Sequence, residues 1–342
     1  MINMLKYFFF LNIIIHTLPS IASFVTPFNH WHCIDIVKNI DTSKPYAYNI
    51  GELPLVTWFN DSTPMTTINI CKHMGSKLDH GTVSNGCLTC PYHGIKHSSK
   101  DTFGKTMIFE DKLWWSYDPN SNKPPTTPYY KNKNYKTVMF SIDMNANIKD
   151  CIYNTLDINH FGFIHNNLFG QNNIIPCEYK YTKYNNDKLS LKYKYTINTN
   201  MLNIKSNLHV FSNYQIFKYP YSSTAILSFP NNENLIINSN MLPIGPNKTK
   251  WIVTLKHNFW KSYIQGVKLD LLIKFILHQD KIQMAKQASE NMLKRKMMNK
   301  LVLRNEEHFK DLDKLFKNYE YPDMISVMRL HNYHNNIFDI IP

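Results

Sequence analysis

Two short segments of the chain combine cysteine and histidine at spacings that can bind a metal. Cys71 and His73 form a CxH pair, and after sixteen intervening residues Cys90 and His93 form a CxxH pair. Two thiolates and two imidazoles satisfy a tetrahedral Zn²⁺ ion, or they hold an iron–sulfur cluster with two thiolates on one iron and two imidazoles on the other. Zinc sites usually pair cysteine with cysteine and histidine with histidine, so the mixed pairs favour the cluster. Cys87, close to Cys90, is expected to be a small packed residue and not a ligand.

Residues suited to tight loops surround both pairs. Gly75, Gly81, Pro91 and Gly94 stand where the backbone must turn sharply and let its N–H groups approach cluster sulfurs. The segments CKHMGSKLDHG and CPYHG resemble the two binding loops of Rieske [2Fe-2S] proteins. This resemblance implies that the cluster ligands are Cys71, His73, Cys90 and His93.

A second set of candidate ligands lies in the segment CIYNTLDINHFGFIH. Asn154, Asp157 and His160 follow one another at intervals of three, and His165 comes five residues later. Residues three apart share a helix face, so the first three can point into one cavity, and His165 would come from the following turn. Two histidines and one distant carboxylate would form the facial triad of a non-haem Fe(II) site, which leaves positions open for oxygen.

Asp280 is the carboxylate that best completes this site. It continues an apolar stripe whose members are three and four residues apart, so it is predicted to be buried, and a buried carboxylate is costly unless it is paired or binds a metal. The stripe consists of Leu269, Leu272 and Ile276. Asp270 and Glu290 are the other acidic candidates, but Asp270 lies off the stripe and Glu290 lies near the basic end of the helix.

The pattern of strands and helices that must position these residues predicts an α+β protein. Short apolar and aromatic segments separated by turn residues indicate an all-β Rieske domain over residues 26–125, with the cluster loops as hairpin tips. Residues 126–342 would form a catalytic mononuclear iron domain, an antiparallel sheet plus helices of helix-grip type. Its strands are predicted in TVMFSIDMNA, LSLKYKYTI, LNIKSNLHVF, STAILSF, NLIINS and KWIVTLKHNFW, with helices from about residue 147 and over about 266–300.

Composition narrows the range of partners. The formal net charge of +13 comes from lysines spread along the chain among many asparagines, and no arginine-rich arm or nucleic-acid motif accompanies them. No nucleic-acid partner is therefore expected, although a basic face could help to dock an acidic electron donor. The cysteines outside the cluster pairs show no disulfide-framework spacing. They are Cys33, Cys87, Cys151 and Cys177.

Residues 1–25 resemble a signal or transit leader. One positive charge precedes a short apolar run, and small residues follow that suit cleavage. We expect the protein to reach a plastid or another organelle. The alternatives are an uncleaved membrane anchor formed by residues 7–15 and a cytoplasmic protein, and membrane association is expected only through this leader.

The two ligand groups together resemble the α-subunits of the Rieske non-haem iron oxygenases. NTLDINHFGFIH is similar to the family's N-x-x-D-x-x-H-x4-H element, and HQDKIQMAKQA is similar to the helix that bears its last iron ligand. The resemblance implies that His160, His165 and Asp280 hold a mononuclear Fe(II), with Asn154 beside it. Asp157 would be the carboxylate that joins His160 to a cluster histidine of the neighbouring subunit in a homotrimer.

This resemblance also implies the reaction. Electrons would pass from a ferredoxin or reductase through the cluster to the mononuclear iron, where O₂ is used to hydroxylate or cleave an apolar, ring-bearing small molecule, most simply as a monooxygenase. The leader and the segment FVTPFNHWHCIDI resemble the pheophorbide a and chlorophyllide a oxygenase branch, which makes a chlorophyll-derived tetrapyrrole one candidate substrate. The C-terminal CxxC of several branch members is missing, and Ile95 replaces the tryptophan common after the second loop.

Two other classes of function compete with an oxygenase. A non-catalytic Rieske electron carrier or redox sensor would need the cluster loops but not the second ligand group. A zinc-stabilised binding protein would need neither iron site, and it would lack the visible absorption of a cluster.

Overall fold

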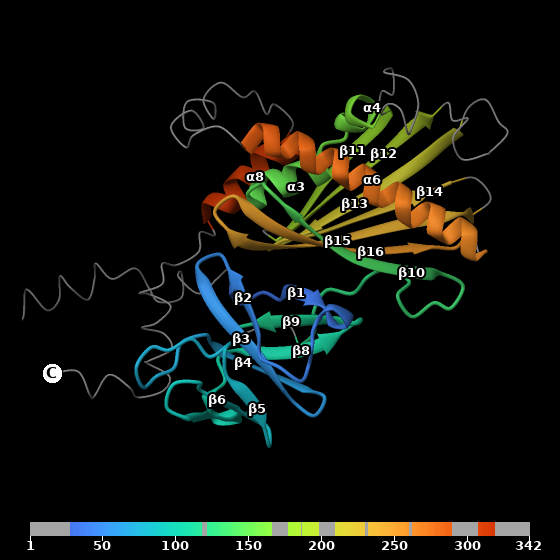
Figure 1. Ribbon diagram of the computed structural model, residues 1–342. Coiled ribbons are helices and arrows are strands. Elements are labelled where there is room, and N and C mark those ends of the chain that lie inside the picture. Colours follow the sequence, from blue (N-terminus) through green and yellow to red (C-terminus); the bar gives the residue numbers. More distant parts are fainter. Residues whose placement is uncertain are drawn as a thin grey trace, which may run out of the picture.

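The computed structural model describes residues 28–117, 122–165, 177–185, 187–197, 209–229, 232–259, 262–288 and 307–318. The leader, residues 1–25, and Glu290 lie outside this part of the chain. The described residues form two parts that lie against each other (Figure 1).

The N-terminal part is built from short strands and two 3-10 helices. Its elements are β1 (His32–Ile36), η1 (Val37–Asn39), β2 (Tyr46–Ile50), β3 (Leu53–Asn60), β4 (Thr63–Ile68), β5 (Thr82–Ser84), β6 (Cys87–Thr89), β7 (Lys96–His97), η2 (Ser99–Asp101), β8 (Lys105–Phe109) and β9 (Lys112–Ser116). They pair into three antiparallel sheets of three strands, in the orders β1-β9-β8, β2-β3-β4 and β5-β6-β7. Strands β3 and β9 are buried on both faces, which explains why LPLVTWFN and KLWWS are almost continuously apolar or aromatic.

The C-terminal part is one large antiparallel sheet with helices. Its elements are β10 (Lys136–Met144), α3 (Ile148–Leu156), α4 (His160–Ile164), β11 (Cys177–Asn185), β12 (Lys188–Ile197), β13 (His209–Lys218), β14 (Ser222–Ser228), β15 (Asn234–Gly245), β16 (Lys248–His257), α6 (Tyr263–Ala288) and α8 (Glu307–Asn318). The strand order is β10-β16-β15-β14-β13-β12-β11, so consecutive strands are neighbours from β11 to β16 and β10 closes the edge beside β16.

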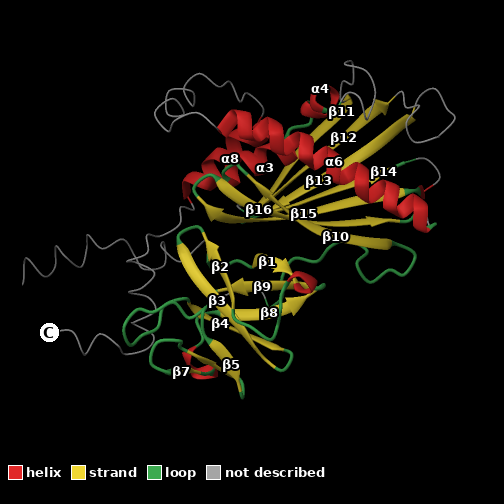
Figure 2. Ribbon diagram, in the orientation of Figure 1, coloured by secondary structure: helices red, strands yellow, loops and turns green. Residues whose placement is uncertain are grey.

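The helices cover one face of this sheet, and the N-terminal part lies on the other (Figures 1 and 2). Successive side chains of β16 point alternately to the two faces of the large sheet. Trp251, Val253 and Leu255 join the core beneath the helices, whereas Ile252 packs with Trp31 and Trp114 of the N-terminal part.

A buried ion pair joins the two parts. Lys250 of β16 lies 2.6 Å from the Asp35 carboxylate of β1, and the Tyr46 hydroxyl donates to the same carboxylate at 2.6 Å. Burial alone would raise the pKa of Asp35, but these donors outweigh burial and hold the pKa below its usual value. The ionised carboxylate therefore stabilises the contact between the two parts.

The α+β class expected from the sequence is confirmed, with some element boundaries shifted. Residues 202–208 of the strand expected over LNIKSNLHVF lie outside the described part, and its last residues belong to β13, which runs from His209 to Lys218. The strand β11 and the helix α8 were not predicted. The long helix expected over about 266–300 is described as α6, which begins at Tyr263, and the residues after 288 lie outside the described part. Among the described helices, none is long and apolar enough to span a bilayer.

Replacement of Asp35 by alanine should destabilise the protein by about 1.5–3 kcal/mol, because it leaves the partly buried Lys250 ammonium without its carboxylate partner. The loss should be largest above about pH 4 and should shrink as the pH falls, because protonation of Asp35 in the wild type removes the same interaction. Thermal unfolding of both proteins across this pH range measures the difference. Asp41→Ala, at an exposed aspartate of the same part, is the control and should leave the melting temperature unchanged. An equal loss in both variants would contradict the assigned role of the ion pair.

Candidate metal centres

The two loops that carry the Cys/His pairs have the same backbone geometry. In the first, the N–H of Cys71 donates to the carbonyl of Ser76 and the N–H of Gly75 donates back to Cys71. In the second, Cys90 donates to the carbonyl of residue 95 and residue 94 donates back to Cys90, at the same offsets. Gly75 and Gly94 both have φ near +70°, a conformation that glycine adopts without strain. The glycine spacing noted in the sequence thus corresponds to two matching turns.

The cysteine sulfurs of the two loops lie together in a buried position. Cys71 and Cys90 are 2% and 3% exposed, and their thiols hydrogen-bond to each other. Burial raises the pKa of Cys71. Burial also opposes ionisation of Cys90, but backbone N–H groups of Tyr92 and His93, together with the Cys71 thiol, lower its pKa. Backbone donors aimed at a sulfur are the environment that a cluster-bound thiolate requires.

The histidines of the two loops meet at the surface. The Nδ1 atoms of His73 and His93 face each other at 3.2 Å, and both rings are exposed. Met74 and Tyr92, next to them in sequence, are 64% and 62% exposed. The four side chains thus supply two buried sulfurs on one side and two solvent-facing nitrogens on the other, which fits a cluster with one thiolate-bound and one imidazole-bound iron.

Gly81 allows the two loops to approach so closely. A Cβ atom at this position would lie 2.2 Å from the carbonyl oxygen of Thr89 in β6. No side chain fits there without moving the backbone that leads to Cys90. Cys87 begins β6 and is paired with Ser84, as expected for a residue in the sheet, and it is half-buried.

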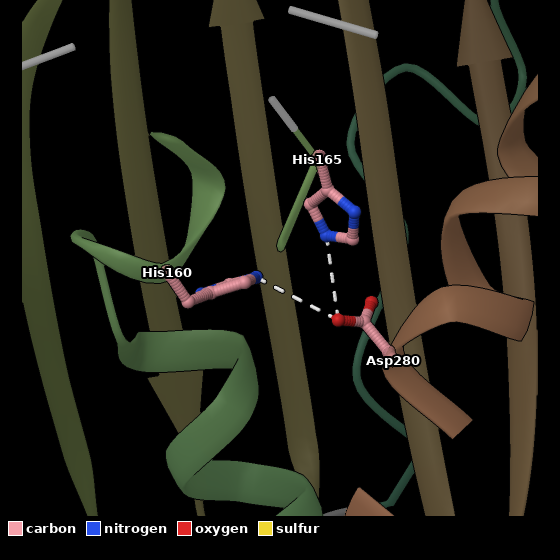
Figure 3. Close-up of side chains that lie close together, drawn as sticks. All are labelled: His160, His165 and Asp280. Carbon is pink, nitrogen blue, oxygen red and sulfur yellow. Dashed lines mark ion pairs between the residues drawn. The ribbon is translucent and has the colours of Figure 1, made fainter. Parts of the chain in front are cut away.

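The second ligand group is brought together from two distant segments. His160 begins α4, His165 follows it directly, and Asp280 projects from α6 toward both rings (Figure 3). The Asp280 carboxylate lies 3.3 Å from Nε2 of His165 and 3.8 Å from Nε2 of His160. The three potential ligand atoms all lie within 4.8 Å of one another. Asp270, by contrast, pairs with Lys274 at 2.7 Å on the outside of the helix.

The Nδ1 atoms of both histidines are oriented by oxygen acceptors. Nδ1 of His160 lies 2.7 Å from the backbone carbonyl of Asp157, and Nδ1 of His165 lies 3.0 Å from Oε1 of Gln279. A carbonyl oxygen can only accept a hydrogen bond, so each neutral ring carries its proton on Nδ1. The lone pair of Nε2 then points toward Asp280. Two imidazole lone pairs and one carboxylate converging on a point fit a divalent metal.

Burial favours a positive charge beside the Asp280 carboxylate. His165 is fully buried and Asp280 is 4% exposed, so the carboxylate has lost nearly all of its water. Asn154 compensates in part, because its side-chain N–H donates to Asp280 at 3.2 Å. A carboxylate so far out of water is costly unless a positive charge lies beside it.

The remaining sequence-predicted residues and one that was missed lie around this group. Asn154 is beside Asp280, and Asp157 ends α3, where its carboxylate accepts from the backbone N–H of Asn159. Gln279 was not foreseen, because its contact with His165 spans 114 residues of sequence. Its position directly before Asp280 is the only sequence signal for it.

The cluster loops and the His160, His165 and Asp280 group lie on opposite sides of the folded molecule. In Figure 1 the loops are beside β5 and β6, at the far side of the N-terminal part, and α4 and α3 are on the helix-covered face of the large sheet. The two centres of one chain are therefore separated by the full thickness of both parts.

Comparison with known proteins assigns a family to the N-terminal part. The family model for the Rieske [2Fe-2S] domain matches residues 30–107. The oxygenase component of a 3-ketosteroid-9-alpha-monooxygenase from Rhodococcus rhodochrous is 24% identical over 160 residues, which is 40% of this chain and 41% of the relative. The chloroplastic pheophorbide a oxygenase of Arabidopsis thaliana is 21% identical over 286 residues, or 70% of this chain and 50% of the relative. The chain thus spans half or less of the length of these relatives.

Solved structures share the fold across both parts. A dicamba monooxygenase bound to dicamba superposes with a TM-score of 0.70 at 14% identity, covering 85% of this chain and 97% of that one. The Pseudomonas putida CBB5 protein NdmA, with caffeine, gives a TM-score of 0.61 at 18% identity, with 75% and 81% covered.

These features define an iron–sulfur protein in which a Rieske domain is joined to an antiparallel-sheet domain with its own ligand group. The chain contains a Rieske [2Fe-2S] domain, and it is similar to the oxygenase component of a 3-ketosteroid-9-alpha-monooxygenase and to pheophorbide a oxygenase. The cofactors expected from the sequence, a [2Fe-2S] cluster and a mononuclear iron that uses O₂, are supported by the Rieske domain, by the oxygenase relatives and by the His/Asp group.

Replacement of Gln279 by leucine should weaken binding of Fe(II) about 10- to 100-fold, because His165 loses the acceptor that fixes its tautomer and orientation. Anaerobic competition with a chelator of known affinity measures this change. Gln283→Leu, one turn further along α6, is the matched control and should bind iron as the wild type does. Equal losses in the two variants would show that the contact with His165 does not orient the ligand.

Proposed function

We propose that this protein is the oxygenase component of an O₂-dependent monooxygenase system that acts on an apolar, ring-bearing small molecule. The observation that carries this proposal is the convergence of His160, His165 and Asp280 in a chain that also carries the Rieske loops. An electron carrier needs only the loops, whereas a group of two imidazoles and one carboxylate leaves iron positions open for O₂.

In this proposal the chain is divided at about residue 125. Residues 26–125 would hold the cluster through Cys71, His73, Cys90 and His93, and residues 126–342 would hold the Fe(II) through His160, His165 and Asp280. When bound, the cluster supplies electrons and the mononuclear iron supplies O₂ activation. A ferredoxin or reductase would deliver the electrons, and the basic charge of +13 suits an acidic donor.

The roles of the surrounding residues follow from their contacts. Asn154 and Gln279 hold Asp280 and His165 in place by donating to the carboxylate and accepting from Nδ1, respectively. Asp157 is half-buried at the end of α3, next to the only partly exposed ligand, His160. We assign to Asp157 the link between His160 and His93 of a neighbouring copy, in a homotrimer. That link would bring together two centres that a single chain keeps apart.

A ring-bearing substrate is supported by the relatives, whose names include a ketosteroid and pheophorbide a. One polar cluster on the inner face of the sheet offers a place for a substrate's polar group. Asn213 donates to the Tyr193 hydroxyl at 2.6 Å, and Gln215 donates to the backbone of Thr155 in α3. Within the described residues, Oδ1 of Asn213 is buried without a hydrogen-bond donor, so it can accept from a hydroxyl or N–H of the substrate. A chlorophyll-derived tetrapyrrole remains one candidate, because pheophorbide a oxygenase covers the larger share of this chain.

The anaerobically purified protein should contain about three irons per chain, two in the cluster and one mononuclear. His165→Ala should lower this to about two, because it removes a buried ligand while leaving the loops untouched. Iron analysis gives the count, and the EPR spectrum of the dithionite-reduced protein reports the cluster. O₂ consumption with ring compounds, beginning with chlorophyll breakdown intermediates and ketosteroids, should require the third iron.

Loop variants separate the oxygenase from its alternatives. His93→Ala should abolish the Rieske EPR signal, whereas His80→Ala, an exposed histidine of the first loop, should keep it. A wild type with only two irons and an intact cluster signal would make the protein an electron carrier or redox sensor. Zinc in place of a cluster signal would contradict both readings.

A further inference from the structure

The long helix α6 carries an apolar stripe on the side that faces away from the sheet. Val267, Leu271, Phe275 and Ile282 are 40%, 61%, 51% and 45% exposed. At 100° per residue they fall within about 80° of one another around the helix. The inner face of α6 is apolar as well, and it packs into the core between the helices and the large sheet. A helix with apolar residues on both faces normally has both of them covered.

Lysines border this outer stripe on both sides. Lys268 and Lys286 fall on one edge, and Lys274 and Lys281 fall on the other. Lys274 also pairs with Asp270 at 2.7 Å, the acidic side chain nearest this edge of α6. The outer face therefore carries an apolar strip, which also includes the exposed His278, between two rows of lysines, and no described helix or strand lies over it (Figure 1).

A groove opens beside one of these rows. It has a volume of about 480 Å³ and lies between α6, the edge strand β10 and the 3-10 helix η1 of the N-terminal part. Its walls combine cationic and apolar side chains, which include Lys38, Lys274, His278, Met139, Phe140 and Ile142. Lys38 donates to the backbone of Met139 at 2.9 Å, so its ammonium is held at the groove.

We propose that the outer face of α6, with this groove, docks on an anionic lipid membrane. A bilayer surface offers phosphate groups to the two lysine rows and acyl chains to the strip between them, while the groove can take a headgroup. A second copy of the chain fits less well, because two such faces packed together would set lysine rows against lysine rows. An exposed apolar strip of this length is otherwise unexpected on a free surface.

Such docking would place the outer face of α6 on the membrane, with Asp280 on the opposite face of the same helix. The face toward the sheet carries Asp280, and the opposite face carries Leu271 and Phe275. An apolar substrate dissolved in the bilayer would then leave the lipid beside the helix that holds the reaction centre. The advantage for catalysis rests on the proposed function, but the docking itself does not.

Vesicle flotation of the full chain tests the proposal without any activity measurement. Binding is expected to vesicles of phosphatidylcholine mixed with phosphatidylglycerol and to be much weaker with phosphatidylcholine alone. Ile282→Glu should lower the bound fraction about tenfold or more, because it places a carboxylate in the strip. Ile108→Glu makes the same change at an exposed isoleucine of β8 and should bind as the wild type does. Lys268→Gln should weaken binding about fivefold.

Hydrogen exchange and molar mass locate the contact. Vesicles should slow amide exchange over residues 267–282 in the wild type and not in Ile282→Glu. Vesicle binding that is unchanged in Ile282→Glu overturns the proposal, and so does protection confined to other segments. If Ile282→Glu instead lowers the molar mass in solution while vesicle binding persists, the strip is an interface between copies. Iron content is measured in parallel, so loss of docking with about three irons retained leaves the proposed function standing.

Discussion

The structure depends on a carboxylate that is almost entirely removed from water. Asp280 is 4% exposed and sits on a helix whose inner face otherwise buries apolar side chains. One amide donor from Asn154 does not offset that desolvation. In their neutral forms, with the proton on Nδ1, His160 and His165 offer Nε2 lone pairs and no positive charge to Asp280. A divalent cation is the partner that satisfies all three groups at once. A metal bound at this point would also stabilise the junction of α4 and α6.

The same helix meets three different environments, which explains why its exposed apolar face was not recognised from the sequence. Its inner face packs on the sheet, one buried position carries the Asp280 carboxylate, and its outer face exposes Leu271 and Phe275 between lysines. Apolar residues on both sides cancel the one-sided pattern by which an amphipathic helix is recognised. The stripe through Leu269 and Ile276 correctly predicted the buried position of Asp280, but it gave no reason to look at the opposite face.

The sequence predicted the parts of the site that depend on local spacing. Mixed Cys/His pairs with glycines at fixed offsets produce the two matching turns, because a turn is closed by residues four and five apart. Contacts between distant segments were not predictable in this way. Gln279 meets His165 across 114 residues, and Lys250 meets Asp35 across 215, and only the folded sheet brings either pair together.

The placement of the two centres constrains how the molecule can work. The large sheet lies between the cluster loops and the His160, His165 and Asp280 group, and the ion pair of Asp35 with Lys250 holds the N-terminal part against the far face of that sheet. A hinge that swung the loops around to α4 would have to break this buried pair and the apolar packing beside it. Exposed His73 and His93, with Met74 and Tyr92 beside them, are instead arranged to meet another surface. The proposed electron transfer between copies of the chain, through Asp157, would leave this ion pair intact, whereas a hinge motion within one copy would break it.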